Sequence, residues 1–343
     1  MINALQHVGQ GVRNVDTTYA FYRRNFGYKI KLNDLTVASK ELEAVLGSVE
    51  TMRMMMAANV KGGGIIELIE HKSKPITSLP DEDLYSRCGI LEIGYGVMNI
   101  DKVVSDFQAR DIRMLTPIHE IDLGHGRRWR TAHLKDPDGL PLQLTEDLLP
   151  GAQSPAKAEV HGVSHVGIGV SDLERSISFY QKVLEFNRLV CEFEGIVPEK
   201  DPVSGDFVRR KMAILERSAD ASGPLAGLLP RGAVKLIETP AGLGRHIYDG
   251  RLWGDVGCME FCLDVSDLLA TVAVMKEKGV EIYLPPMEMS MGTGSKGFLA
   301  YIRDPDGTTV EFVEVRSIFW LSSTRFMRLA LPLLRLYDRL SPG

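Results

Sequence analysis

The sequence predicts an α+β fold built from four tandem units, each made of a strand, a helix and several further strands. One short strand pattern occurs four times, and it always starts with His or Glu and reaches a valine five residues later. The copies are His7–Val12, Glu92–Val97, His165–Val170 and Glu260–Val265. A helical stretch follows each copy, and units 2 and 4 also share the phrase Asp-Pro-Asp-Gly. Because each repeat forms one supersecondary unit, repetition at this scale defines the architecture.

The spacing between copies shows that the chain consists of two matching halves. His7 and His165 are 158 residues apart, whereas Glu92 and Glu260 are 168 residues apart. The second half has therefore gained ten residues. We expect them in a longer loop within the polar stretch 194–227, which is rich in turn-forming residues.

The first half shows the elements of two units. Strand 7–12 leads into a helix that Asp16 can cap and that Gly27 ends. Residues 52–57 and 65–69 are mostly apolar or alternate between apolar and polar side chains, and both patterns predict strands.

Unit 2 has a strand at 91–97 and a helix from Asp101 to about Arg110. Residues 130–134 and 140–145 then flank the Asp-Pro-Asp-Gly turn, as in a strand–turn–strand hairpin.

The second half repeats this order. Asp172 is expected to cap the helix of unit 3, and Asp267 begins the helix of unit 4. The halves predict one domain over residues 1–148 and another over residues 161–315, joined by a Pro-, Gly- and Ala-rich linker at 149–160.

Residues 316–343 fall outside the repeat and predict a basic amphipathic helical tail. Arg316–Leu340 contains five arginines and one acid among many apolar residues, and Pro332 is expected to break or kink the helix. The alternation of basic and apolar side chains favours docking onto the protein itself, self-association or peripheral contact with a membrane.

Composition excludes several classes of protein. The 343 residues carry a formal net charge of −5, which gives no reason to expect nucleic acid as a partner. We see no basic N-terminal region followed by an apolar run, and no stretch long enough to span a bilayer. The four cysteines form no disulfide framework and are expected to be reduced. A cytoplasmic location follows as the expectation.

These residues resemble the vicinal oxygen chelate superfamily, which includes glyoxalase I, methylmalonyl-CoA epimerase, fosfomycin and bleomycin resistance proteins and extradiol dioxygenases. The resemblance covers roughly residues 3–315 in a four-unit form. It rests on His165-Val-Gly-Ile-Gly-Val-Ser-Asp172, Ser178-Phe-Tyr180, Ile66-Glu-Leu-Ile-Glu70 and Asp304-Pro-Asp-Gly-Thr-Thr-Val-Glu-Phe312. It implies βαβββ modules that form two cupped mixed sheets, each around one metal site.

The resemblance also implies the ligand positions, with one ligand on the first strand of each unit and another on the last. Carried over, the first-strand ligands are His7, Glu92, His165 and Glu260. The last-strand positions are Glu67, Gln143, Lys235 and Glu311. Residues two apart on a strand share a face, which supports the placement.

The pairing of units decides which ligands meet. If unit 1 pairs with unit 4, one site holds His7, Glu67, Glu260 and Glu311, and the other holds His165, Glu92, Gln143 and Lys235. Pairing within halves instead gives His7, Glu67, Glu92, Gln143 and His165, Lys235, Glu260, Glu311. We favour the first pairing because it separates an intact site from a degenerate one that has a lysine where a ligand belongs.

For some of the predicted site residues, the sequence also offers an alternative. Glu67 competes with Glu70, one strand alternation away, and Cys262 can line the same cup or simply fill space. The basic loop 125–130 is either solvated or binds an anionic substrate through Arg127 and Arg130.

The ligand types favour proton transfer next to a carbonyl. Extradiol dioxygenases hold iron with two His and one carboxylate, whereas neither pairing gathers the two repeated His residues. The resemblance therefore implies one divalent ion (Zn, Mn, Co, Ni or Fe), a small carbonyl or vicinal-oxygen substrate, and an isomerase, epimerase or lyase acting through a metal-stabilised enediolate. Glu67 and Glu311 are the candidate catalytic carboxylates. The alternatives are a non-haem iron dioxygenase and a non-catalytic small-molecule binding protein of the resistance type.

Overall fold

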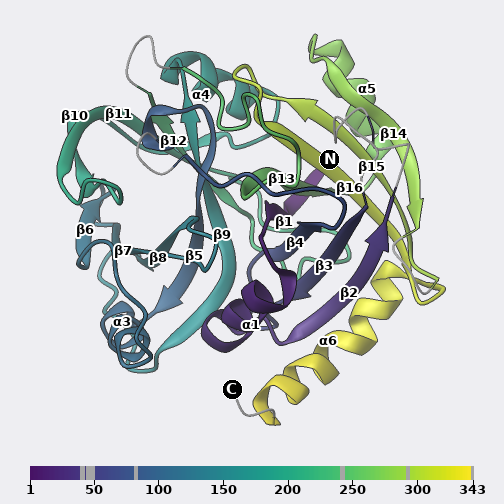
Figure 1. Cartoon of the computed structure of the whole chain (residues 1–343), viewed down its shortest axis with the longest axis horizontal. Helices are drawn as coiled ribbons and strands as arrows, with labels where there is room; N and C mark the ends of the chain where they lie inside the picture. The colour runs from purple at the N-terminus through teal and green to yellow at the C-terminus, as the bar shows by residue number, and fades with distance from the viewer. Residues whose placement is uncertain (39–42, 44–50, 81–83, 240–243, 291–293, 341–343) are drawn as a thin grey trace.

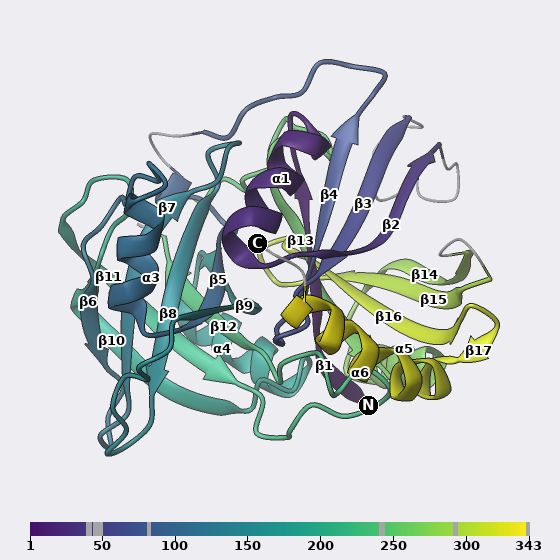
Figure 2. The same ribbon diagram turned by 90° about the horizontal axis from the view of Figure 1, so that it is seen from below.

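The computed structural model contains two curled mixed sheets that lie side by side, with helices packed against them (Figure 1). It describes residues 1–38, 43, 51–80, 84–239, 244–290 and 294–340. Turned by 90°, the molecule shows the same two sheets, splayed apart at their far edges (Figure 2). The α+β class of four repeated units is confirmed.

The first sheet has the strand order β14-β15-β16-β13-β1-β4-β3-β2, and β17 pairs with β16. Its strands are β1 (Ile2–Gly11), β2 (Ile30–Val37), β3 (Met52–Ala58), β4 (Ile65–His71), β13 (Gly257–Val265), β14 (Ile282–Ser290), β15 (Lys296–Arg303), β16 (Thr309–Ile318) and β17 (Leu321–Ser322). This sheet therefore combines unit 1 with unit 4.

The second sheet has the order β10-β11-β12-β9-β5-β8-β7-β6 and combines unit 3 with unit 2. Its strands are β5 (Gly89–Met98), β6 (His119–Asp122), β7 (Arg128–Lys135), β8 (Pro141–Leu148), β9 (Glu159–Val170), β10 (Arg188–Lys200), β11 (Phe207–Glu216) and β12 (Ala233–Glu238). The helices are α1 (Val15–Phe26), α3 (Ile100–Gln108), α4 (Leu173–Lys182), α5 (Leu268–Glu277) and α6 (Ser323–Leu340), with a short 3₁₀ turn at Leu84–Ser86. The favoured pairing, unit 1 with unit 4, is thus the observed one.

A repeated glutamate joins the last strand of each unit to the start of that unit's helix. Glu70 accepts a hydrogen bond from the backbone N–H of Val15, at 3.0 Å. Glu238 and Glu314 accept from Leu173 and Leu268, both at 2.9 Å. In unit 2, Glu146 accepts from the N–H of Asn99 at 2.8 Å. A carboxylate at a helix N-terminus satisfies an unpaired donor and complements the helix dipole, so this acid has a structural task in every unit.

The helix caps differ in one place from the sequence prediction. Asp172 and Asp267 cap α4 and α5 as expected, and Gly27 ends α1 with φ 71°. Asn14, not Asp16, caps α1, since its side chain accepts from the N–H of Thr17. Asp16 lies in the first turn and binds Arg53 instead.

The two Asp-Pro-Asp-Gly turns connect the sheets. In unit 2, Asp136 accepts hydrogen bonds from Gln10 and Tyr22 of unit 1, at 2.6 and 3.2 Å. In unit 4, Asp304 accepts from Tyr180 of unit 3 at 2.9 Å. Because units 1 and 2 belong to different sheets, as do units 3 and 4, each turn links one sheet to a tyrosine on a helix of the other.

The ten extra residues lie in a loop that begins inside the predicted stretch 194–227 and extends five residues beyond it. Much of the stretch 194–216 is strand, in β10 and β11. The loop 217–232, between β11 and β12, has 16 residues, whereas the matching loop 59–64, between β3 and β4, has six. The difference of ten accounts for the change in offset. This inserted loop supplies Leu225, Leu228 and Leu229 to a small apolar cluster that also contains Met327 of α6.

The C-terminal tail forms α6, which runs through Pro332 without ending there. Of the two effects predicted for Pro332, a break of the helix does not occur, whereas a kink stays a prediction. Pro332 lies on the exposed face of the helix, where water can satisfy the carbonyl that loses its backbone donor. Among the described residues, none of the helices combines the length and apolar character needed to cross a membrane.

Candidate metal centre

Four adjacent strands of the first sheet bring together the residues that the sequence predicts as ligands. His7 is on β1, Glu67 on β4, Glu260 on β13 and Glu311 on β16, and all four are buried. The register pairs His7 with Cys262, Cys262 with Glu311, and Gly9 with both Glu67 and Glu260. A Cβ at Gly9 would lie 2.8 Å from Glu260 Oε1, so this glycine makes room for the acid.

The ligand atoms converge on one point. His7 Nε2 lies 3.0 Å from Glu311 Oε2 and 3.6 Å from Glu67 Oε2. One donor atom from each of His7, Glu67 and Glu260 falls within 4.8 Å of the others, and the same holds for His7, Cys262 and Glu311. We use the name first cup for the place where these four predicted ligands meet.

Several of these atoms are buried without a hydrogen-bond partner. They are His7 Nε2, Glu260 Oε2 and Glu311 Oε2. Buried polar atoms are nearly always satisfied, and unpaired buried carboxylates are costly. A divalent cation among these atoms would satisfy all three, so the donor set fits a metal ion.

The titration behaviour of the first cup shows the same excess of negative charge. Burial raises the pKa of Glu67 to about 7, an effect that His7 opposes and Glu311 strengthens. Burial, together with Glu311 and Glu67, also holds the pKa of Glu260 well above its usual range. Burial alone would lower the pKa of His7, but Glu311 and Glu67 outweigh it and raise that pKa.

A chain of hydrogen bonds behind His7 orients its ring. His7 Nδ1 lies 3.0 Å from Gln6 Oε1, and Gln6 Nε2 donates to Asp264 Oδ1 at 3.1 Å. Since Gln6 Oε1 can only accept, the ring carries its proton on Nδ1. Nε2 therefore faces the carboxylates, where it can carry a proton in the metal-free protein and would offer its lone pair to a bound metal.

Tyr301, on β15, is a site residue that the sequence analysis missed. Its hydroxyl donates to Glu311 Oε1 at 2.9 Å, which leaves the other oxygen of Glu311 free to face His7. Tyr301 pairs with Glu311 across the strands, and His133 pairs with Gln143 at the equivalent place in unit 2. The offset of 168 between Tyr301 and His133 was the signal that could have revealed both.

The equivalent residues of the second sheet, here called the second cup, interact with one another. Lys235 Nζ and Glu92 form a buried ion pair, and Tyr85 donates to the same carboxylate. His165 Nε2 lies 2.7 Å from Gln143 Oε1. Although burial alone would raise it, Lys235 and His133 hold the pKa of Glu92 well below its usual range. Burial and the nearby Lys235 lower the pKa of His165 to about 3.

The two cups therefore differ in how their charge is balanced. In the second cup, Lys235 lies at the position that is equivalent to Glu67 of the first cup. Its ammonium group forms an ion pair with Glu92. Among the residues described by the structure, the groups of side chains with metal-binding spacing both lie in the first cup.

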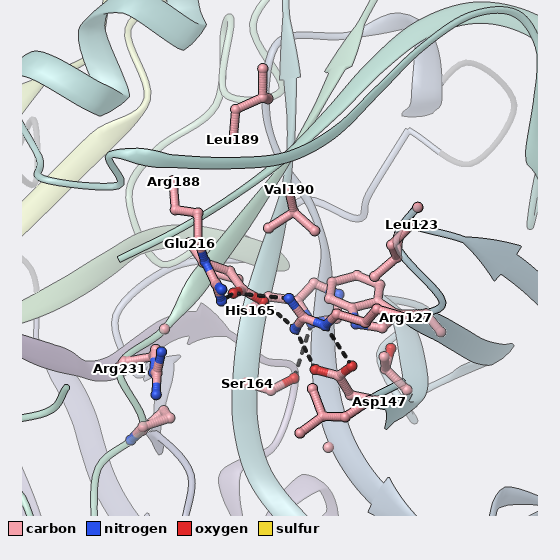
Figure 3. A pocket seen from close by; sticks show the side chains of 18 of the residues that line it. Leu123, Arg127, Asp147, Ser164, His165, Arg188, Leu189, Val190, Glu216 and Arg231 are labelled. Atoms are coloured by element: carbon pink, nitrogen blue, oxygen red, sulfur yellow. Dashed lines mark hydrogen bonds and ion pairs between the residues drawn. The ribbon is translucent and has the colours of Figure 1, made fainter. Parts of the chain in front are cut away.

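A cavity of about 660 Å³ opens beside His165 of the second cup (Figure 3). Its walls include Trp129, Leu189 and Val190, and its charged lining includes Arg127 and Arg188. Arg127 binds Asp147 at 2.9 Å and Glu216 at 2.6 Å.

Arg130, the other arginine of the predicted substrate loop, lies apart from this lining. It binds Asp101 at 2.8 Å and Glu146 at 3.1 Å, close to the start of α3. Arg127 thus lines a cavity of the second cup, away from the candidate metal centre of the first cup. Arg130 instead forms ion pairs with two acids near the N-terminus of α3. A substrate role for either residue stays a prediction.

Glu67 and Glu70 are separated by their surroundings. Glu67 points into the first cup, whereas Glu70 binds the first turn of α1. Cys262 also faces the first cup, and burial raises the pKa of its thiol well above the usual range. It therefore remains a neutral thiol while no cation is nearby.

Comparison with known proteins supports the resemblance seen in the sequence. The family described as the Glyoxalase/Bleomycin resistance protein/Dioxygenase superfamily matches residues 4–144 and again residues 162–312. The chain belongs to this superfamily. No curated protein matches the sequence.

Solved structures share the fold at low sequence identity. A mutant form of glyoxalase I from Zea mays superimposes with a TM-score of 0.57 at 19% identity, covering 95% of this chain and 96% of that one. A putative dioxygenase from Bacillus subtilis gives a TM-score of 0.55 at 11% identity, covering 99% and 97%. At these identities the likeness shows the fold alone, and the reaction has to be argued from the site.

Proposed function

We propose that the protein is a divalent-metal-dependent isomerase, epimerase or lyase that moves a proton next to a carbonyl group. The convergence of His7, Glu67, Glu260 and Glu311, with unpartnered buried atoms turned toward one another, carries this proposal. The superfamily to which the chain belongs contains metal-dependent enzymes, which agrees with it.

The donor set suits Zn, Mn, Co, Ni or Fe in the divalent state, since it offers one imidazole and three carboxylates. Such an ion would act as a Lewis acid that binds substrate oxygens and stabilises the negative charge that develops on them. His7, Glu260 and Glu311 would hold it, with Tyr301 and Gln6 fixing the orientation of two of these side chains.

Glu67 is the proposed general base. A base works best when its pKa is near the working pH, and burial raises the pKa of Glu67 to about 7. It would take a proton from the carbon next to the carbonyl and return it to the same or the neighbouring carbon. Glu311 is the second candidate for this role, but its hydrogen bond to Tyr301 restrains it more.

An iron dioxygenase is less well supported. Such a site uses two His and one carboxylate with open positions, whereas the first cup has a single His. The protein should first be analysed for bound metal and then incubated in D₂O with a panel of 2-hydroxycarbonyl compounds. Deuterium on the carbon next to the carbonyl is expected. Turnover that strictly requires O₂ would contradict the proposal.

Non-catalytic binding is a second candidate function, and it concerns the second cup. The cavity there combines apolar walls with Arg127 and Arg188, both of which pair with Glu216 of the same lining. An apolar molecule that carries a carboxylate would replace this glutamate as the partner of Arg188. Benzoate and related aromatic acids should shift the NMR signals of this cup without added metal. The response should be lost in Arg188→Gln, and its persistence there would exclude this site.

A further inference from the structure

Helix α6 has one face packed on the protein and another that lies open. On the inner face, Met327 is buried against Leu225, Leu228 and Leu229 of the inserted loop. Arg335 adds a hydrogen bond to the carbonyl of Gly227 at 2.7 Å. The helix lies along the outside of the first sheet in both views of the molecule (Figures 1 and 2).

The open face carries a row of large apolar side chains. Leu329, Leu333, Leu336 and Leu340 are 64, 66, 52 and 73% exposed. Their spacing of four, three and four residues places them along one stripe of a helix. Trp320, just before the helix, is 79% exposed. Single exposed leucines are ordinary on a protein surface, but a continuous row of this kind marks an interaction site.

A row of arginines runs beside the leucines. Arg325, Arg328 and Arg339 are exposed on the neighbouring part of the same face, and Arg335 is exposed at its border, where it also binds Gly227. The only acid in α6 is Asp338, and it binds Lys29 of the protein at 3.4 Å. The open face of α6 therefore carries apolar side chains and positive charges, and no negative charge.

We propose that this face of α6 docks onto the surface of an anionic lipid bilayer. An amphipathic helix with a basic border lies in the plane of the interface, with its apolar row among the acyl chains and its cations at the headgroups. Acidic headgroups would supply the negative charge that the helix itself does not offer to the arginines.

A second copy of the chain suits the same face less well. A symmetric contact through the leucine row would bring two arginine rows together, and α6 offers no unpaired acid to receive them. Charge complementarity therefore selects the lipid surface over self-association.

The proposal is tested with the full-length protein and two kinds of vesicle, phosphatidylcholine alone and phosphatidylcholine mixed with phosphatidylserine. The protein should sediment with the mixed vesicles and much less with the neutral ones, and salt should weaken the binding. Replacing both Leu329→Ser and Leu333→Ser should abolish most of it. Both side chains are exposed, so the fold should survive, which the melting curve checks.

The charge row has a matched control. Each arginine near an anionic surface strengthens binding by about fivefold, so Arg325→Gln with Arg328→Gln should weaken partitioning about 25-fold. Arg113→Gln with Arg209→Gln changes the net charge equally at exposed sites away from α6, in the loop before β6 and on β11, and binding should stay within about twofold.

Three outcomes would overturn the proposal. One is equal binding to neutral and anionic vesicles, and another is an equal loss in the control variant. The third is a wild-type protein that ignores both vesicles but forms a dimer that Leu329→Ser with Leu333→Ser converts to monomer. That result would assign the face to a second copy.

Discussion

The two cups occupy equivalent positions in equivalent sheets, yet they balance charge in opposite ways. In the first cup, three carboxylates surround His7, and the pKa values of Glu67 and Glu260 are raised. In the second cup, Lys235 binds Glu92, and the pKa of that carboxyl is lowered. The same fold therefore places a cluster of carboxylates in one sheet. At the equivalent place in the other sheet, it places the positively charged side chain of Lys235. The cups differ at two ligand positions, Lys235 in place of Glu67 and Gln143 in place of Glu311, so the second cup has two fewer carboxylates and a cation of its own.

The largest expected effect separates the two equivalent first-strand acids. Glu92→Gln leaves the buried ammonium of Lys235 without its counter-charge and should lower the free energy of unfolding by about 3–5 kcal/mol. Glu260→Gln removes one of several like charges and should raise the stability of the metal-free protein by roughly 1 kcal/mol at pH 8. Urea unfolding of both variants measures the contrast. Equal losses in the two variants would mean that the cups do not differ in charge balance.

Metal affinity should separate the two last-strand positions. Glu311→Gln should weaken metal binding by at least about 100-fold, because even the loss of a residue that only supports a ligand costs 10–100-fold. Gln143→Ala, at the equivalent position in the second cup, should leave affinity unchanged. Titration of the metal-free proteins with Zn²⁺ or Mn²⁺ gives both values. The reverse pattern would move the metal site to the second cup.

The pH dependence of metal binding follows from Glu67. Its pKa of about 7 is raised from the unfolded value, so the protonated form adds stability to the metal-free protein below pH 4.5, and this stability is lost as the pH rises through 7. The negative charge of ionised Glu67 next to the ion favours metal binding, so metal affinity should fall as the pH drops below 7. Calorimetric titration at several pH values should also detect proton release. Glu67→Gln should make this profile shallower without removing it, because His7 and Glu260 also lose protons when a metal binds. An unchanged slope in that variant would show that Glu67 has no part in the pH dependence.

The smallest expected effect concerns Tyr301. Tyr301→Phe removes the hydroxyl that holds Glu311 and should weaken metal binding by about fivefold, the equivalent of one lost hydrogen bond. Tyr283→Phe, on the neighbouring strand β14, is the matched control and should leave affinity unchanged. If the two variants behaved alike, Tyr301 would have no part in positioning Glu311.

Much of the fold and of the candidate site could be predicted because the repeat preserves both spacing and face. His7, Glu92, His165 and Glu260 share one place in their strands, and strand alternation then fixes which neighbours share their side. The repeated Asp-Pro-Asp-Gly turn was equally visible, but its task of binding a tyrosine of the other sheet was not. That task depends on how the units pair in space.

Other features depend on contacts that no local pattern encodes. Asn14 and Asp16 are both good capping residues, and the entry angle of the chain into α1 decides between them. The inserted residues lie in the loop 217–232, which packs against α6, and α6 lies outside the repeat, so the repeat could not reveal this contact. Tyr301 acts through a cross-strand neighbour ten residues away.

The crossed pairing of units has a consequence for synthesis of the chain. β1 is synthesised long before β13, yet Ile2 pairs with Val265 of β13, and this edge of β1 stays open until that strand has been made. At 5–20 residues per second, the wait is roughly ten seconds or more. An unpaired edge of this length invites wrong pairing between nascent chains. The N-terminal half made alone should therefore aggregate, and its solubility should return when the C-terminal half is produced in the same cell.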